Sequence, residues 1–204
     1  MKISIPLNVI KAASYCVANN KDIRHYLRHV CFDFKHGEVN HLRLISTDGA
    51  ILSAFQVDLV YEDDSQSADF QLIVPIDVIK NAIKTKRNNI VFESLPDGRY
   101  MLADNVFSPV DGKYPDYMRV IPSITDKPAD KPLQFDPDLL VKGKDALNAF
   151  RNYSNPVNFR LDHLPTLGSV MHDGASDAVI VVMPLRDSAF AHMNSDNYQG
   201  FFSI

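Results

Sequence analysis

One order of secondary-structure signals recurs along the sequence: a short strand, a helix with one apolar face, and three further strands. The first occurrence covers residues 2–60 and the second covers residues 70–110. In both, apolar residues alternate where strands are expected and return every three or four residues where a helix is expected. A repeated βαβββ unit restricts the chain to a few layered folds, because one unit alone leaves an apolar helix face uncovered.

A third copy of the pattern begins with a short strand at residues 133–135. Asp136 is a good N-cap for the following helix, and Pro137 suits its first turn. Two units can pack their helices together on one face of a joined sheet, which gives a two-layer α+β domain. The third unit is then an odd half whose sheet edge and helix need cover, from a second chain or from the first domain. Its remaining strands are expected over residues 157–161, 166–172 and 178–183.

A stiff connector separates the complete domain from the odd half. Pro115 and Pro122 restrict the backbone of residues 113–122 and favour extended conformations before them. The segment is too apolar for a solvated linker and too rich in proline for a central strand, so we expect it to pack between two bodies. The predicted divisions are a domain over residues 1–122, a linker over 123–131, a half-domain over 132–186 and a tail over 187–204.

The composition is typical of a soluble globular protein. Hydrophobic residues make up 46% and charged residues 23% of the chain, no apolar run is long enough to span a bilayer, and the first residues lack the apolar core of a signal peptide. Cys16 and Cys31 have apolar neighbours, so we expect buried, reduced thiols and a cytoplasmic location. The net charge of −4 argues against sequence-blind coating of nucleic acid, but a local basic face remains possible.

Three short motifs fall on these elements in a fixed order, although each alone is weak. Together with the βαβββ repeat, they resemble the bacterial DNA polymerase III beta subunit, the sliding clamp. Residues 1–122 resemble the middle domain of that family and residues 132–186 its last half-domain, which implies a shortened clamp. The motifs are Thr47-Asp48-Gly49, Tyr114-Pro115-Asp116-Tyr117 followed by Val120-Ile121-Pro122, and Val181-Val182-Met183-Pro184-Leu185-Arg186.

The resemblance implies a processivity factor that is not an enzyme and needs no cofactor. Family clamps are rings of twelve βαβββ units that encircle duplex DNA without sequence preference and recruit DNA polymerase. Four chains of three units would supply twelve, and a pair of chains could each donate a third unit to one shared domain. We therefore expect a homo-oligomer, a dimer or a tetramer. The alternatives are a truncated mimic that competes for clamp partners without encircling DNA, and an enzyme built on the same fold.

In the family, a hydrophobic pocket between the middle and last domains binds short apolar peptides of polymerases and the clamp loader. Aliphatic side chains and a methionine can hold a Leu or Phe anchor, although the same residues could be ordinary interdomain packing. The family usually follows Thr-Asp-Gly with His-Arg-Leu, whereas Ala50-Ile51-Leu52 stands here and removes two polar rim contacts. The matching positions are Leu27, Thr47, Gly49, Leu52, Pro115, Val120, Val182, Met183, Pro184 and Leu185.

The family's helices line the hole of the ring, so basic residues on the helices are candidate DNA contacts. Lys80, Lys84 and Arg87 follow one another at i, i+4 and i+7, opposite the apolar face of the second helix. Such a row can face phosphates without reading sequence, although a merely solvated face is the alternative. Lys11, Lys142 and Arg151 lie on the other helices. The residues matching a family loop near the DNA are Lys21, Arg24, His25 and Tyr26.

The end of the sequence has a further resemblance. The family normally stops soon after the last motif, whereas this chain continues and finishes with Gln199-Gly200-Phe201-Phe202-Ser203-Ile204. A glutamine followed by paired aromatic residues resembles the clamp-binding peptides themselves, so the segment could occupy a pocket on a neighbouring copy. An ordinary C-terminal tail is the alternative.

No catalytic or metal-binding motif stands out. The pairs His25/His29 and His36/His41 lack a nearby cysteine or carboxylate pair that would complete a zinc site. A Gly-rich phosphate loop, a nucleophile elbow and an HExxH motif are all missing from the sequence, which argues against the enzyme alternative.

Overall fold

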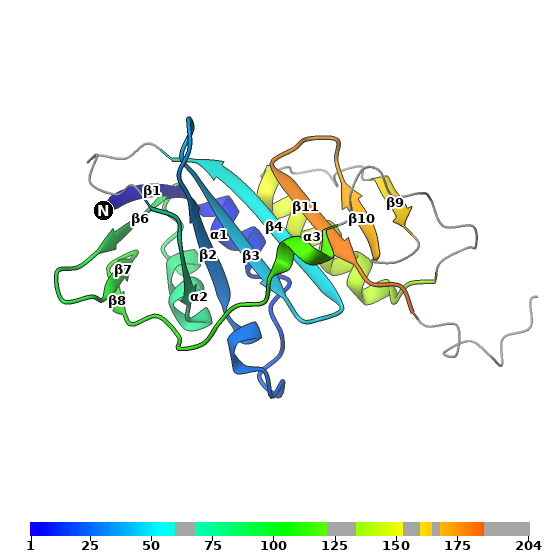
Figure 1. The fold of residues 1–204 in the computed structure, drawn as a ribbon, viewed down its shortest axis with the longest axis horizontal. Coiled ribbons are helices and arrows are strands. Elements are labelled where there is room, and N and C mark those ends of the chain that lie inside the picture. The colour runs from blue at the N-terminus through cyan, green and yellow to red at the C-terminus, as the bar shows by residue number, and fades with distance from the viewer. Residues whose placement is uncertain (60–67, 122–133, 153–159, 165–167, 186–204) are drawn as a thin grey trace, which may run out of the picture.

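The structure, a computed structural model, describes residues 1–59, 68–121, 134–152, 160–164 and 168–185, with the backbone alone for residues 160–164 and 168. Three units follow one another along the chain (Figure 1). Unit 1 contains β1 (Lys2–Pro6), α1 (Leu7–Ala13), η1 (His25–Arg28), β2 (Val30–Lys35), β3 (His41–Thr47) and β4 (Ile51–Asp58). Unit 2 contains β5 (Phe70–Val74), α2 (Ile76–Lys84), β6 (Asn89–Ser94), β7 (Tyr100–Leu102) and β8 (Asn105–Phe107). After η2 (Tyr117–Val120), unit 3 contains α3 (Pro137–Arg151), β9 (Arg160–Leu164), β10 (Gly168–His172) and β11 (Ala178–Val182).

Units 1 and 2 exchange their first strands. β1 pairs antiparallel with β6 of unit 2, with Ile3 opposite Phe92, and β5 pairs antiparallel with β2 of unit 1, with Ile73 opposite Cys31. The α+β fold of repeated units is therefore confirmed, but the prediction of one joined sheet is wrong. The strands form a four-stranded sheet in the order β1-β6-β7-β8 and a seven-stranded sheet in the order β5-β2-β3-β4-β11-β10-β9.

Unit 3 extends the sheet of unit 1. β11 pairs antiparallel with β4, from Ala178 opposite Phe55 to Val182 opposite Ile51. On the helical side, the Phe150 ring of α3 stacks on Phe55 with 4.8 Å between ring centroids. The half-domain was expected to be covered by a second chain or by the first domain. The first domain covers it along β11.

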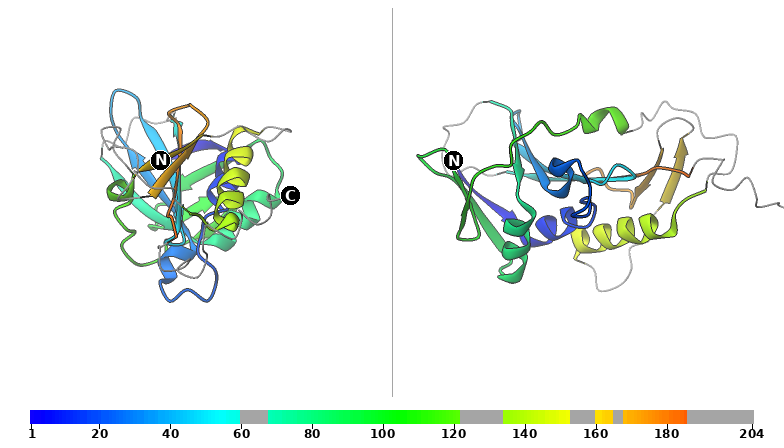
Figure 2. Two further views of the ribbon diagram at one scale, coloured as in Figure 1. Left: turned by 90° about the vertical axis from the view of Figure 1, so that its right-hand side faces the viewer. Right: turned by 90° about the horizontal axis from the view of Figure 1, so that it is seen from below.

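The two faces of the seven-stranded sheet bury different partners. Because successive strand residues point to opposite faces, Phe32 and Phe55 pack toward α1, α2 and α3. Their neighbours Cys31 and Ala54 pack on the opposite face, where Tyr114 of the connector joins them. The right-hand view of Figure 2 shows the three helices on one side of the sheets and the connector with η2 on the other.

Two predicted elements differ in extent. The helix expected over residues 6–19 ends at Ala13, because Ser14 caps it and its hydroxyl donates to the Lys11 carbonyl (2.7 Å). The strand expected over residues 133–135 is not formed at Gln134 and Phe135, while Leu133 lies outside the described residues. Apolar spacing continues past both boundaries because the flanking residues are themselves partly buried.

Both cysteines are buried and free, which confirms that part of the prediction. Burial raises the pKa of Cys16 to about 12, so its thiol stays protonated at neutral pH and is a poor nucleophile.

Arg151 at the end of α3 is tied to the turn between β10 and β11. Its guanidinium donates to Asp173 Oδ1 (3.0 Å) and to Asp177 Oδ2 (2.9 Å), and it lies over the Phe150 ring at 4.7 Å from the centroid. The hydrogen bonds from Arg151 hold the pKa of Asp173 below its usual value. The helix of unit 3 is therefore fastened to its own strands by charge-assisted bonds.

This network predicts acid sensitivity. A lowered carboxyl pKa contributes stability that is complete above the unfolded value of about 3.9 and is lost as pH falls through the folded value. We expect Asp173→Asn to lower the free energy of unfolding by about 1.5–3 kcal/mol at pH 7, and the difference from wild type to shrink toward pH 3. Urea unfolding across this pH range measures the effect. A difference that stays constant with pH would contradict the role of this carboxylate.

Candidate functional site

An apolar cavity of about 200 Å³ lies where unit 1, the connector and the end of β11 meet. One side of the cavity is formed by η1 and the β3–β4 turn, and a second side by η2 and the residues before it. The third side is formed by the end of β11 and Met183 after it. The lining residues are Arg24, Leu27, Thr47, Gly49, Ala50, Ile51, Leu52, Pro115, Asp116, Tyr117, Val120, Val181 and Met183.

The Thr47-Asp48-Gly49 turn is held by its own side chains. The Thr47 hydroxyl donates to the Ile51 carbonyl (2.7 Å) and accepts from the Gly49 amide (3.0 Å). Asp48 Oδ1 accepts from the amides of Ala50 (2.9 Å) and Ile51 (3.0 Å). These local bonds fix the turn that forms the cavity wall.

Gly49 is favoured at this turn because its φ of +93° is strained for any other residue. A Cβ there would lie 2.8 Å from Nη1 of Arg24, at the end of a flexible side chain that can shift. Arg24 donates from Nη2 to the Asp48 carbonyl (3.0 Å) and to Asp22 Oδ2 (2.7 Å). The hydrogen bonds that Arg24 donates to the Asp22 carboxylate lower the pKa of Asp22 to about 2. The cavity rim therefore carries an ion pair that persists at neutral pH.

The connector is anchored on the sheet by buried hydroxyl groups. Tyr117 Oη donates to Asp33 Oδ2 (2.5 Å) and accepts from Arg43 Nη1 (3.4 Å). Tyr114 is buried nearby in the same cluster. With both tyrosines fixed, the backbone between and after them holds Pro115 and Val120 against the cavity.

Unit 3 completes the cavity. The Met183 amide donates to the Ala50 carbonyl (2.8 Å), which continues the β4–β11 pairing by one bond. Lys142 of α3 forms an ion pair with Asp48 at 2.8 Å. The side chains of Val181 and Met183 line the cavity beside the β3–β4 turn. Neither unit 1 nor unit 3 alone would enclose this space.

Most residues of the predicted pocket meet at this cavity. Seven line it, whereas Val182, Pro184 and Leu185 do not. Val182 is fully buried on the helical face, because its neighbours Val181 and Met183 take the opposite face of the strand. The pocket assignment of Val182 is corrected to Val181 by this alternation. The seven lining residues are Leu27, Thr47, Gly49, Leu52, Pro115, Val120 and Met183.

Several lining residues were not expected from the sequence. Val181 could have been found from Met183, because residues two apart on a strand share a face. Tyr117 and Asp116 directly follow Pro115, but their position depends on the long-range bond to Asp33. Arg24 was predicted as a DNA contact, which stays a prediction, and the structure also places it on the cavity rim.

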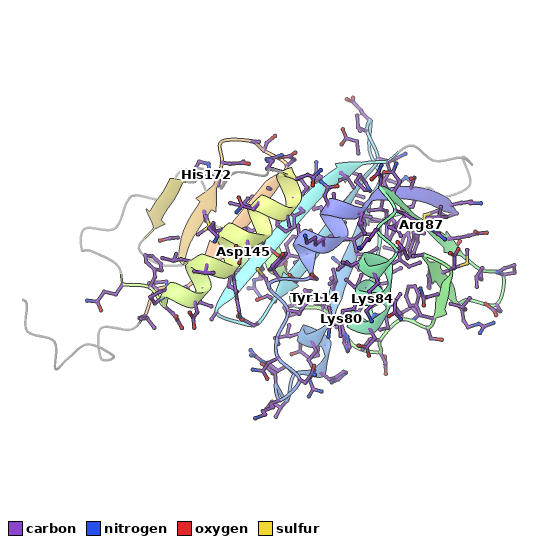
Figure 3. The ribbon with its side chains drawn as sticks, turned by 180° about the vertical axis from the view of Figure 1, so that it is seen from behind. Lys80, Lys84, Arg87, Tyr114, Asp145 and His172 are labelled. Atoms are coloured by element: carbon purple, nitrogen blue, oxygen red, sulfur yellow. The ribbon has the colours of Figure 1, made fainter. Side chains whose placement is uncertain are left out.

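The helical side carries the predicted basic row on α2 (Figure 3). Lys80 and Lys84 are exposed, and within the described residues neither forms an ion pair. Arg87 lies beyond the helix end and pairs with Asp104 at 2.8 Å. The side chains of Lys142 and Arg151 are likewise committed to carboxylates of the same chain. Among the described residues, the exposed basic side chains of α1, α2 and α3 without an ion pair are Lys80 and Lys84 of α2 and Lys11 of α1.

The predicted DNA loop projects beyond the ends of β2 and β3, where η1 lies at the lower edge of Figure 1. Lys21 is exposed, and Tyr26 is half-buried with its ring against His25. His25 Nε2 lies 3.2 Å from the Asp111 carbonyl, which links the loop to the start of the connector. The four predicted residues stay close in sequence and space, but Arg24 faces the cavity.

The described part of the chain contains no cluster of three or more His, Cys, Asp or Glu residues suited to a metal ion. Among those same residues, none of the helices has the length and apolar character needed to cross a membrane. The segment Gln199–Ile204, with its resemblance to clamp-binding peptides, lies outside the described residues.

Comparison of the sequence with family models and with curated proteins gave no match. The structure, in contrast, is similar to solved bacterial clamps. It matches the DNA polymerase III subunit beta from Pseudomonas aeruginosa with a TM-score of 0.68 at 18% identity, over 91% of this chain and 66% of that one. It matches the DNA polymerase sliding clamp from Bacillus subtilis with a TM-score of 0.67 at 14% identity, over 91% and 64%.

A further match is the Caulobacter crescentus pol III beta, with a TM-score of 0.63 at 18% identity, over 91% of this chain and 65% of that one. The chain therefore spans about two thirds of the length of the clamps that it matches. The described residues have the fold of the bacterial DNA polymerase III beta subunit, the sliding clamp.

Proposed function

We propose that this chain is a non-enzymatic, clamp-like processivity factor. It binds duplex DNA through its helical face without reading sequence, and it recruits a DNA polymerase through a short apolar peptide held in the cavity. A clamp loader would use the same cavity. The observation that carries the proposal is the apolar cavity built jointly by units 1 and 3 in a chain with the clamp fold.

The cavity chemistry supports a peptide anchor. Leu27, Leu52 and Val181 are apolar and buried around it, and Met183 adds an adaptable thioether at the mouth. A volume of about 200 Å³ accommodates one or two large apolar side chains and excludes a folded domain. Ala50 and Ile51 make this rim less polar than the family pattern, so affinity depends on apolar burial and on Arg24.

The helical face supports weak phosphate contacts. Lys80 and Lys84 lie one turn apart on α2, where their ammonium groups are free to approach a backbone. Contacts of this kind are electrostatic and independent of sequence. Since Arg87, Lys142 and Arg151 are paired within the chain, the face provides few free cations, as suits a sliding contact.

The third unit supports self-association. The Leu185 amide donates to the Gln134 carbonyl (2.7 Å), just as the Val110 amide donates to the carbonyl of Ile73 in β5 (2.9 Å). The backbone at Gln134 is thus placed like the end of a first strand. β9 corresponds to β2 and β6, which each pair with the first strand of another unit, yet β9 is the last strand of its sheet among the described residues. Two chains that exchange first strands would complete one shared domain.

A second candidate is a mimic that binds clamp partners without encircling DNA. It is favoured by the number of basic side chains on the helical side that are neutralised within the chain, among them Arg87 and Arg151. Such a protein would keep the cavity and lose duplex binding. The two candidates therefore differ in one measurable property.

Duplex binding separates them. We expect a fluorescent duplex oligonucleotide to bind the wild type weakly, and the double variant Lys80→Glu/Lys84→Glu to bind at least tenfold more weakly. The slope of log K against log salt should fall by about 2 because two phosphate contacts are removed. Lys113→Glu on the connector changes an exposed charge on the other side of the sheet and should have no comparable effect. Equal binding by all three proteins would refute the helical face as the DNA contact.

A further inference from the structure

β4 and β8 are the fourth strands of units 1 and 2, and β11, the last strand of unit 3, takes the fourth position of the βαβββ pattern. Two of these three strands, β4 and β11, pair with each other. β4 of unit 1 and β11 of unit 3 run antiparallel over five residue pairs, from Ile51 with Val182 to Phe55 with Ala178. This junction is the link between the two-unit domain and the half-domain. Fourth strands are therefore the elements through which neighbouring domains of this chain join.

The fourth strand of unit 2, β8, ends the four-stranded sheet. It pairs with β7 on one side, and no described strand lies along its other side. Val106 at its centre is 47% exposed. β8 contains no lysine or proline, two residues that commonly protect sheet edges. The outer edge of β5 in the seven-stranded sheet differs from that of β8. There the Val110 amide donates a hydrogen bond to the Ile73 carbonyl of β5.

We propose that a second copy of the chain pairs with β8 through its own β8, antiparallel and about a two-fold axis. The same patch then serves both partners, as in isologous interfaces. The junction repeats the arrangement of β4 and β11 between chains. This inference rests on the self-association proposed above for a clamp-like processivity factor, and it names a second surface through which copies of the chain join.

The two junctions together account for a complete ring. In a pair of chains that share a domain through their third units, six units form an arc whose outer ends are the two copies of β8. Figure 1 shows β8 and β9 at opposite ends of the chain, as such an arc requires. Two such arcs joined through their copies of β8 would close into a ring of four chains.

The β8 junction would be shorter than the β4–β11 junction within the chain. β8 has three residues, compared with five paired residues in the β4–β11 junction. Fewer main-chain hydrogen bonds would make this contact sensitive to dilution.

Light scattering coupled to gel filtration tests the junction on the full chain. We expect the wild type at high concentration to have four times the chain mass of 22.9 kDa, and Val106→Lys to have half of the wild-type mass. Val91→Lys is the matched control, because Val91 is a 39% exposed valine in β6, which is an interior strand of the same sheet. It should keep the wild-type mass.

Cross-linking gives an independent measurement. A two-fold pairing centred on Val106 brings the two copies of this residue opposite each other, with Cα atoms about 4.5–5.5 Å apart, which a disulfide can bridge. Oxidised Val106→Cys should therefore form covalent dimers, whereas Val91→Cys should stay monomeric. Cys16 and Cys31 give little background because both are buried.

A monomeric wild type, an unchanged mass for Val106→Lys, or an equal loss of mass in both lysine variants would overturn the β8 junction. Circular dichroism of Val106→Lys checks that the variant is folded. Peptide affinity is measured on the same samples. Loss of peptide binding in every protein would contradict the cavity assignment alone, and a change in mass confined to Val106→Lys would still support the junction.

Discussion

Replacing Met183 with aspartate is expected to weaken peptide binding by about tenfold to a hundredfold while leaving the protein folded. Met183 lines the cavity and is 38% exposed, so a carboxylate at its position remains hydrated in the free protein. A bound apolar anchor would have to strip water from that charge. Burial of a Leu or Phe side chain contributes about 1.5–3 kcal/mol, and each 1.4 kcal/mol corresponds to a factor of ten in affinity.

Fluorescence anisotropy of a short labelled peptide ending in Leu-Phe measures this effect. Met118→Asp is the matched control, because Met118 is an exposed methionine in η2 that does not line the cavity. It should bind the peptide like wild type. If Met183→Asp binds as tightly as wild type, or if both variants weaken binding equally, the cavity is not the peptide site.

Replacing Phe150 with alanine is expected to lower the free energy of unfolding by about 3–5 kcal/mol and to abolish peptide binding as well. The Phe150 ring is buried between units 1 and 3, stacked on Phe55 at 4.8 Å and covered by the Arg151 guanidinium at 4.7 Å. Its removal leaves a cavity beneath β4 and β11. Unit 3 would then loosen from unit 1, and Val181 and Met183 would leave the peptide site.

Urea unfolding and peptide anisotropy, recorded on the same protein, test the coupling. Val141→Ala on α3 is the control, because this valine is 49% exposed and its truncation removes little buried area. We expect that variant to keep both its stability and its peptide affinity. A Phe150→Ala protein that is destabilised but binds peptide normally would show that unit 3 does not complete the cavity.

The order of elements could be predicted from the sequence because helix and strand periods are local. The exchange of first strands could not, because β1 finds its partner β6 in the next unit and no local pattern names that partner. The same difference appears in the extent of α1. Val17 continues the apolar spacing of the helix, but the chain has already turned at Ser14.

In the candidate site, too, local sequence patterns do not show which single residues long-range pairing brings together. Thr47, Gly49 and Pro115 could be predicted because their motifs carry backbone constraints that are visible in sequence. Val181 and Val182 are identical side chains, so only the register of β11 on β4 decides which one faces the cavity. The position of Arg24 on the cavity rim depends on bonds to Asp22 and Asp48 that no local pattern shows, and its contact with DNA stays a prediction.

The exchanged first strands also determine when the protein can fold during synthesis. As the chain emerges from the ribosome, β1 must wait for β6, with Ile3 unpaired until Phe92 has been made. β4 then waits for β11, with Phe55 exposed until Ala178 follows. Long-range pairings of this kind slow folding, because large loops must close before any contact stabilises them. The chain is therefore expected to acquire its native structure late in translation, and to depend on protection of its unpaired strands until then.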